Sequence, residues 1–173
     1  KSVGTVKDIV ITGATGGVGS MLSERLAEKG HHIICLGRNR ARLDKLVNEL
    51  SSKGYKVSME VADMMKQLEV EEAEARIRHN HGQIDVWINN VGVNNHNAIG
   101  PSWELAPENW WTEVSLNLYT AYLGTRTAIR LMKERNSGYI INLGGGGVQE
   151  PKPFGSAYGA AKTAIVKFTE TVN

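Results

Sequence analysis

The feature that most constrains this chain is a glycine-rich turn between an apolar strand and a helix. The strand Asp8–Thr12 (DIVIT) runs directly into the turn, whose residues are Gly13, Ala14, Thr15, Gly16, Gly17, Val18 and Gly19. Glycines let the backbone approach a phosphate closely, and a helix start supplies free N–H groups and partial positive charge. No lysine follows as it does in the phosphate loop of ATPases. The turn therefore predicts a dinucleotide site; its alternative is an ordinary strand-to-helix turn.

Strands and helices alternate along the whole chain. Apolar runs rich in β-branched residues lie at Asp8–Thr12, His32–Leu36, Lys56–Met59, Ile84–Asn89 and Tyr139–Leu143. Helical patterns lie at Val18–Lys29, Arg40–Lys53, Met64–His79, Pro107–Lys133 and from Ser156 to near the end. Continuously apolar strands separated by helices are typical of a parallel sheet covered on both faces. We expect an α/β fold, a doubly wound Rossmann-like sheet.

The chain ends abruptly. A length of 173 residues fits one domain, so we expect a single dinucleotide-binding domain over residues 1–173. A doubly wound sheet of this kind normally continues to a sixth strand, and none follows the last helix. The fifth strand would then be a bare sheet edge, which proteins avoid. We therefore expect the domain to be incomplete and to lack its C-terminal strands.

Composition excludes several classes of protein. Hydrophobic residues at 41% and charged residues at 22% are the mix of a folded protein, and a net charge of +2 is too small to indicate nucleic acid. The single cysteine, Cys35, excludes a disulfide framework and is expected to be buried, and the histidines form no metal pattern. No apolar run is long enough to span a membrane, and Lys1–Asp8 resembles no signal peptide, so we expect a cytoplasmic protein.

Two further groups of residues are assigned to structure. An acidic run on the third helix is expected to face solvent; it consists of Glu69, Glu71, Glu72 and Glu74. Three tryptophans near the start of the long fourth helix are expected mainly to pack there, although one or two of them could line a pocket; they are Trp103, Trp110 and Trp111.

The residues after the second strand favour NADP over NAD. An acidic residue about 20 positions past the glycines would bind the ribose hydroxyls of NAD. Here Leu36 is followed by Gly37 and Arg38, and no carboxylate occurs before Asp44. A guanidinium can pair with a 2′-phosphate, whereas a carboxylate repels it. The alternative is that Arg38, with its neighbouring arginines, only decorates an exposed helix start.

A tyrosine and a lysine share one face of the last predicted helix. Tyr158 and Lys162 are four residues apart, which places them one turn from each other. A free phenol is a poor acid–base group at neutral pH, and a nearby ammonium stabilises its phenolate form. Such a pair can exchange the proton of an alcohol while a nicotinamide carries hydride. A tyrosine and a lysine at this spacing are common on helix surfaces, so the pair indicates a catalytic site only together with the other motifs.

Five motifs in the same order resemble the short-chain dehydrogenase/reductase family and cover nearly the whole chain. They are Thr12–Gly19, Asp63 after the third strand, Asn89-Asn90-Val91-Gly92, Asn117 in the long helix, and Tyr158 to Lys162. The resemblance implies NAD(P) use and oxidoreduction of a carbonyl or alcohol. It also implies Tyr158 as acid/base, Lys162 as its partner and ribose-binding group, and Asn117 as a relay residue.

The expected cofactor site follows from the turn and the resemblance together. Its residues are Gly13, Thr15, Gly16, Gly17, Val18, Gly19, Arg38, Asp63, Asn90, Gly92, Tyr158 and Lys162, and no metal is expected. In the family the long helix and the Tyr/Lys helix form subunit contacts, so the resemblance also implies a homodimer or homotetramer.

Two departures from the family's pattern limit the inference. The family's serine lies thirteen residues before the tyrosine, and that position here is Gly145, within the run Gly144–Gly147. Backbone N–H groups of the run could replace the missing hydroxyl, and Ser156 is a second candidate. We expect slower or more selective catalysis, and a gain of activity in Gly145→Ser. The other departure is Val91, where the family has alanine.

These observations leave three hypotheses. The leading one is an NADP-preferring oxidoreductase that interconverts a secondary alcohol and a ketone. The second is a non-catalytic dinucleotide-binding protein, a sensor or scaffold, which Gly145 favours and the Tyr158, Lys162 and Asn117 set opposes. The third and weakest is a nucleic-acid partner that uses basic residues after the second strand, with steeply salt-dependent binding; these are Arg38, Arg40, Arg42 and Lys45.

Overall fold

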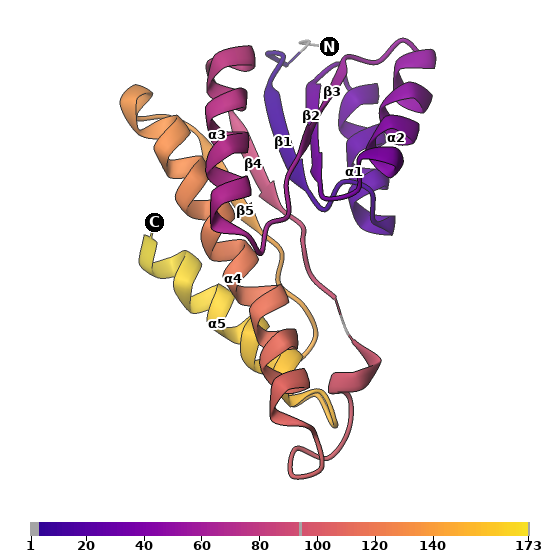
Figure 1. The fold of residues 1–173 in the computed structure, drawn as a ribbon. Coiled ribbons are helices and arrows are strands. Elements are labelled where there is room, and N and C mark those ends of the chain that lie inside the picture. Colours follow the sequence, from indigo (N-terminus) through magenta and orange to yellow (C-terminus); the bar gives the residue numbers. More distant parts are fainter. Residues whose placement is uncertain (1–3, 94, 173) are drawn as a thin grey trace.

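The computed structural model, which describes residues 4–93 and 95–172, contains a five-stranded parallel sheet (Figure 1). The strand order is β3-β2-β1-β4-β5, so the chain reverses direction across the sheet after β3. The strands are β1 (Asp8–Thr12), β2 (His32–Gly37), β3 (Val57–Val61), β4 (Val86–Asn89) and β5 (Tyr139–Asn142). The helices are α1 (Gly17–Glu28), α2 (Arg40–Ser52), α3 (Gln67–His81), α4 (Pro107–Met132) and α5 (Ser156–Val172). The doubly wound α/β fold expected from the alternating pattern is confirmed.

Helices cover both faces of the sheet. Helices α1 and α2 lie on one face, while α3 and α4 lie on the other and α5 packs against α4 (Figure 1). Each face has its own apolar core because side chains alternate along a strand. In β1, Ile9 and Ile11 point towards α1 and α2, whereas Val10 points towards α3 and α4. The central strands are buried on both sides, which explains their continuously apolar sequences.

The last strand is the least covered part of the sheet. Among the described strands, β5 pairs only with β4. Tyr139 and Ile141, which alternate with partly buried neighbours, are 72% and 43% exposed. The bare edge expected at the fifth strand is therefore present in the described part of the chain.

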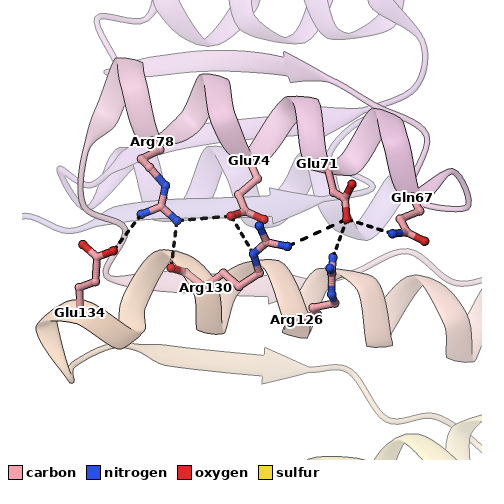
Figure 2. A network of polar contacts seen from close by, with 7 residues as sticks. All are labelled: Gln67, Glu71, Glu74, Arg78, Arg126, Arg130 and Glu134. Atoms are coloured by element: carbon pink, nitrogen blue, oxygen red, sulfur yellow. Dashed lines mark hydrogen bonds and ion pairs between the residues drawn. The ribbon is translucent and has the colours of Figure 1, made fainter.

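The acidic run on α3 does not simply face solvent, contrary to the sequence expectation. Glu74 is only 4% exposed, and its Oε1 lies 3.1 Å from Arg130 Nε and 3.3 Å from Arg78 Nη2. Glu71 accepts a hydrogen bond of 3.0 Å from Arg126 Nη1. Figure 2 shows that the Glu74–Arg130 and Glu71–Arg126 pairs join α3 to α4, whereas Arg78 lies on α3 itself. The expectation fails because α4 brings its arginines to that face of α3, which a local pattern does not reveal.

One expectation drawn from composition, the burial of Cys35, is confirmed. Cys35 is fully buried, and burial raises the pKa of its thiol to about 11. Within the described helices there is none whose length and apolar character would allow it to cross a membrane. No group of three metal-ligating side chains occurs within residues 4–93 and 95–172.

Candidate active site

The glycine-rich turn connects β1 to α1 at the carboxyl end of the sheet. Gly13 has a φ of 61°, a conformation that glycine adopts without strain. A Cβ on Gly19 would overlap the carbonyl oxygen of Gly13 and would lie 2.7 Å from Asn90 Nδ2. Only glycine fits there, because α1 begins directly against the turn. The residue before α1, Gly16, has no side chain to cap the first N–H groups, which suits an anion.

Side chains tie this turn to the end of the neighbouring strand β4. Thr12 Oγ1 accepts a hydrogen bond of 3.0 Å from the Asn90 N–H, and Asn90 Nδ2 donates to the Gly13 carbonyl at 3.2 Å. The loop that follows β4 is thereby held beside the glycine turn. Asn90 thus fixes the turn's shape in addition to any contact with a cofactor.

Arg38 and Asp63 lie past the ends of β2 and β3, on the side of the sheet expected for an adenosine group. Arg38 is exposed and directly follows β2, two residues before α2 begins. Asp63 is half-buried, and its Oδ1 accepts a hydrogen bond of 2.9 Å from the Met65 N–H. That bond holds the Asp63 carboxylate in place at the end of β3.

Tyr158, Lys162 and Asn117 come together from two helices. Lys162 Nζ lies 5.7 Å from the centre of the Tyr158 ring and donates a hydrogen bond of 3.1 Å to the Leu143 carbonyl. A Cβ on Gly92 would lie 2.8 Å from Asn117 Oδ1 and 3.2 Å from Lys162 Nζ, so both polar groups border Gly92. Lys162 is 6% exposed, and burial lowers the pKa of its ammonium.

Asn117 also fastens α4 to the loop after β4. Its Nδ2 donates hydrogen bonds of 2.9 Å to the carbonyls of Val93 and Glu113. Its Oδ1 is buried without a hydrogen-bond partner in the described structure. A buried amide oxygen needs a partner, and here it points to the space beside Lys162 and Gly92.

Tyr158 lies directly against the glycine that replaces the family's serine. A Cβ on Gly145 would overlap Tyr158 Oη, whereas Gly144 and Gly146 have open space around them. The other serine candidate, Ser156, is engaged elsewhere, since its hydroxyl accepts a hydrogen bond of 3.0 Å from Trp110 Nε1. The phenol therefore approaches the glycine run more closely than a side chain at position 145 would allow.

The three tryptophans behave differently from one another. Trp110 packs against Val114 and Ala157 between α4 and α5, as expected for a residue at a helix start. Trp103 is 85% exposed and Trp111 is 64% exposed, so packing at the helix start is wrong for these two. Trp111 lines an apolar groove on the outer face of α4 and α5.

Sequence reasoning missed two charged residues near the site, Lys152 against the tyrosine and the buried Glu113. Lys152 Nζ lies 4.0 Å from the centre of the Tyr158 ring. Glu113 is 1% exposed, its Oε2 accepts a hydrogen bond of 3.0 Å from the Asn95 N–H, and burial raises its pKa. Two signals were available: Lys152 stands between two prolines, and Glu113 stands one helical turn before Asn117.

The residues present fit a dinucleotide. The uncapped start of α1 and the glycine cradle can hold a pyrophosphate. The buried Asn117 oxygen and the Lys162 ammonium lie beyond the end of β4, next to the tip of the neighbouring strand β5. In open α/β sheets ligands bind at the carboxyl ends of the strands, where the strand order reverses. The expected site residues lie just past the carboxyl ends of the strands or on the helices that follow them.

The glycine turn after β1 and the buried Lys162 beside Tyr158 lie on a fold of the dinucleotide-binding type. Comparison with known proteins identifies the family. The model of the short chain dehydrogenase family matches residues 7–173, and the chain belongs to that family.

Relatives and solved structures agree with this assignment. NADP-dependent 3-hydroxy acid dehydrogenase of Shigella flexneri is 32% identical over 163 residues, covering 93% of this chain and 63% of the relative. The structure of an actinorhodin polyketide ketoreductase variant with NADPH has a TM-score of 0.89 at 28% identity, covering 96% of this chain and 64% of the other. An NAD⁺-bound xylitol dehydrogenase has a TM-score of 0.90 at 29% identity, with coverages of 96% and 63%. The chain thus spans less than two thirds of the length of these proteins.

Proposed function

We propose that the protein is an NADP-preferring oxidoreductase that transfers hydride between a nicotinamide and a carbonyl or secondary alcohol. The observation that carries this proposal is the convergence of Tyr158, Lys162 and Asn117 beside the loop that follows β4. A protein that only binds a dinucleotide has no need of an acid–base group with a buried ammonium next to it. We propose one dinucleotide-binding domain over residues 1–173.

Each residue of the site has a different role in the proposed reaction. When bound, NADPH supplies the hydride. Tyr158 Oη gives its proton to the carbonyl oxygen during reduction and takes it back during oxidation. Lys162 Nζ stabilises the phenolate that remains. Asn117 Oδ1, which borders Gly92 together with that ammonium, accepts a hydrogen bond from a water that relays the proton. Backbone N–H groups of the glycine run at 144–147 can donate to the substrate oxygen, but without the serine hydroxyl the site has one donor fewer than the family's pattern.

Arg38 supports the preference for NADP. The exposed guanidinium follows β2 directly, where an acidic residue would bind the ribose of NAD. The relative from Shigella flexneri is NADP-dependent and the ketoreductase structure contains NADPH, although the xylitol dehydrogenase contains NAD⁺. The remaining expected cofactor residues keep their roles in this proposal: the glycine turn for the pyrophosphate, and Asp63 with Asn90 for the adenosine side.

A second candidate function is a non-catalytic dinucleotide-binding sensor or scaffold. Gly145 favours it because the family's hydroxyl donor is missing. The two functions differ in whether a bound NADPH is ever oxidised by a carbonyl compound.

Cofactor titration followed by a ketone panel tests the proposal. We expect NADPH to bind more tightly than NADH, Arg38→Ala to reduce that difference, and a subset of ketones to oxidise NADPH. Tyr158→Phe should abolish turnover because it removes the hydroxyl that exchanges the proton, while NADPH still binds through the glycine turn and Lys162. Tyr139→Phe, at an exposed tyrosine of β5, is the matched control and should be fully active. Tight NADPH binding with no turnover of any carbonyl would establish the sensor instead.

We further propose that the protein is cytoplasmic and self-associates through α4 and α5. Their outer face carries an apolar groove lined by Trp111, Leu118, Tyr119, Tyr122 and Phe168, among others. Tyr119 and Tyr122 are 37% and 44% exposed, which is unusual for neighbouring aromatic residues on one helix face.

A further inference from the structure

A second ammonium lies against the tyrosine of the site, and the reaction proposed above does not use it. Lys152 belongs to the loop between β5 and α5, and its Nζ is 4.0 Å from the centre of the Tyr158 ring. This is closer than the 5.7 Å from Lys162 Nζ to the same centre. A cation over a tyrosine ring is attracted to the ring face, so the phenol and the ammonium are held as a pair.

A tight turn fixes the backbone of Lys152. The residue stands between Pro151 and Pro153, and its carbonyl accepts a hydrogen bond of 3.1 Å from the Gly155 N–H. Phe154, the third residue of this turn, has a φ of 59°, which is strained for a residue with a side chain. A proline followed by a positive φ is the pattern of a type II turn, where glycine is usual at that position. The loop keeps a strained backbone and thereby presents Lys152 in one orientation.

Contacts outside the turn hold it further. The Phe154 carbonyl accepts a hydrogen bond of 2.9 Å from the Gly100 N–H in the neighbouring loop. The stem of Lys152 passes between Gly147 and Gly155, where added Cβ atoms would lie 3.2 Å and 2.9 Å from its carbons. Glycine at both positions leaves room for the stem, so the side chain is directed by its surroundings.

The charge of Lys152 has no contacting carboxylate in the described structure. No acidic oxygen of residues 4–93 and 95–172 lies within 4.0 Å of its Nζ. Glu113 is the nearby buried carboxyl group, and both of its oxygens lie within 3.2 Å of the Asn95 nitrogen. Burial raises the pKa of Glu113, although the charge of Lys152 opposes this. A half-buried ammonium without an ion-pair partner, aimed at the reacting group, is suited to an anion that arrives with the substrate.

We propose that Lys152 determines specificity by binding the carboxylate of an acidic substrate whose carbonyl lies at Tyr158 Oη. The inference rests on the proposed function and names its substrate class. Since the ammonium lies over the ring that carries the reacting hydroxyl, it suits a carboxylate that is one or two carbons from the carbonyl, as in a short oxo acid. In reduction the carbonyl carbon gains the hydride and the oxygen gains the proton of Tyr158. The carboxylate stays bound and unchanged.

Paired substrates test the inference on the whole protein with NADPH. We expect 3-oxobutyrate to be reduced with a higher kcat/KM than its methyl ester, which lacks the charge. Lys152→Met keeps the stem and should lower kcat/KM for the acid by roughly tenfold to a hundredfold, mainly through KM, because one charge-assisted hydrogen bond is lost. The ester should change by less than about twofold, and Lys152→Arg should retain most of the preference for the acid. Lys167→Met, at a 78% exposed lysine of α5, is the control and should alter neither substrate.

A binding measurement separates this inference from the proposed function. Butyrate carries the carboxylate but no reducible group, so its dissociation constant, followed by isothermal titration in the presence of NADP⁺, needs no turnover. We expect Lys152→Met to raise the dissociation constant of butyrate by at least about tenfold. If no carbonyl compound is reduced but butyrate binding depends on Lys152, the proposed oxidoreductase function is wrong and the anion-binding role of Lys152 is supported. If ketones are reduced but acid and ester behave alike, or if butyrate binds both proteins equally, the role of Lys152 is wrong.

Discussion

The hydroxyl of Tyr158 occupies the space that any side chain at position 145 would need. In the resembled family a serine hydroxyl stands at this position and contacts the substrate oxygen. Here the phenol takes that space, so a substitution at Gly145 does two things at once. Any side chain at position 145 displaces the phenol. A serine side chain also adds a hydroxyl that can donate a hydrogen bond to the substrate.

A comparison of two substitutions at Gly145 separates these effects. Gly145→Ala displaces the phenol without adding a donor, so we expect kcat/KM for a ketone to fall below the wild-type value. Gly145→Ser displaces it equally but adds the hydroxyl, and should exceed Gly145→Ala by roughly a hundredfold, the usual worth of one such donor. Steady-state kinetics with NADPH measures both. From the sequence alone, Gly145→Ser is expected to be more active than the wild type. That expectation does not include the contact between position 145 and Tyr158 Oη. Equal rates for the two variants would show that the glycine backbone already supplies the donor.

At the scale of elements, local pattern predicted the strands and helices because each carries its own signal. Strand β1 is predicted residue for residue, and α4 ends one residue earlier than expected. Helix α3 begins at Gln67 rather than Met64, since Asp63 and Met65 form a turn before it. The glycine turn and the Tyr158–Lys162 spacing are local too, so the sequence reveals them. Glu74 and Lys152 are different, because their surroundings come from distant segments of the chain.

The ion pairs between α3 and α4 should contribute to stability because one partner is buried. Glu74 is 4% exposed, and Arg130 and Arg78 are its two charged partners (Figure 2). Arg130→Met removes one of them and leaves a buried carboxylate less well paired. We expect the free energy of unfolding to fall by about 2 kcal/mol or more.

Urea denaturation measures this change against a matched exposed pair. Arg25 is 72% exposed and pairs with Glu28 at 3.5 Å, so Arg25→Met should change stability by less than about 0.5 kcal/mol. Similar effects of the two substitutions would mean that the α3–α4 pairs are no stronger than surface pairs.

At the scale of the whole molecule, the outer face of α4 and α5 carries an apolar groove with partly exposed aromatic rings. Tyr122 stands at its centre, with its ring 6.1 Å from those of both Tyr119 and Phe168. These rings pack against one another on the outer face of α4 and α5. Burying them between two copies would remove apolar surface from water in each protomer, which is the main driving force of association.

A charge at Tyr122 should therefore separate the protomers without unfolding them. Tyr122 is 44% exposed, so Tyr122→Glu leaves the core intact but places a carboxylate in the proposed interface, where burial without a partner is costly. Light scattering coupled to gel filtration should show a dimer or tetramer for the wild type and a monomer for the variant, with unchanged circular dichroism. Leu68→Glu, at a 74% exposed leucine of α3, makes the same kind of change elsewhere and should keep the wild-type mass. A monomeric wild type, or a Tyr122→Glu protein of undiminished mass, would mean that this face serves another purpose.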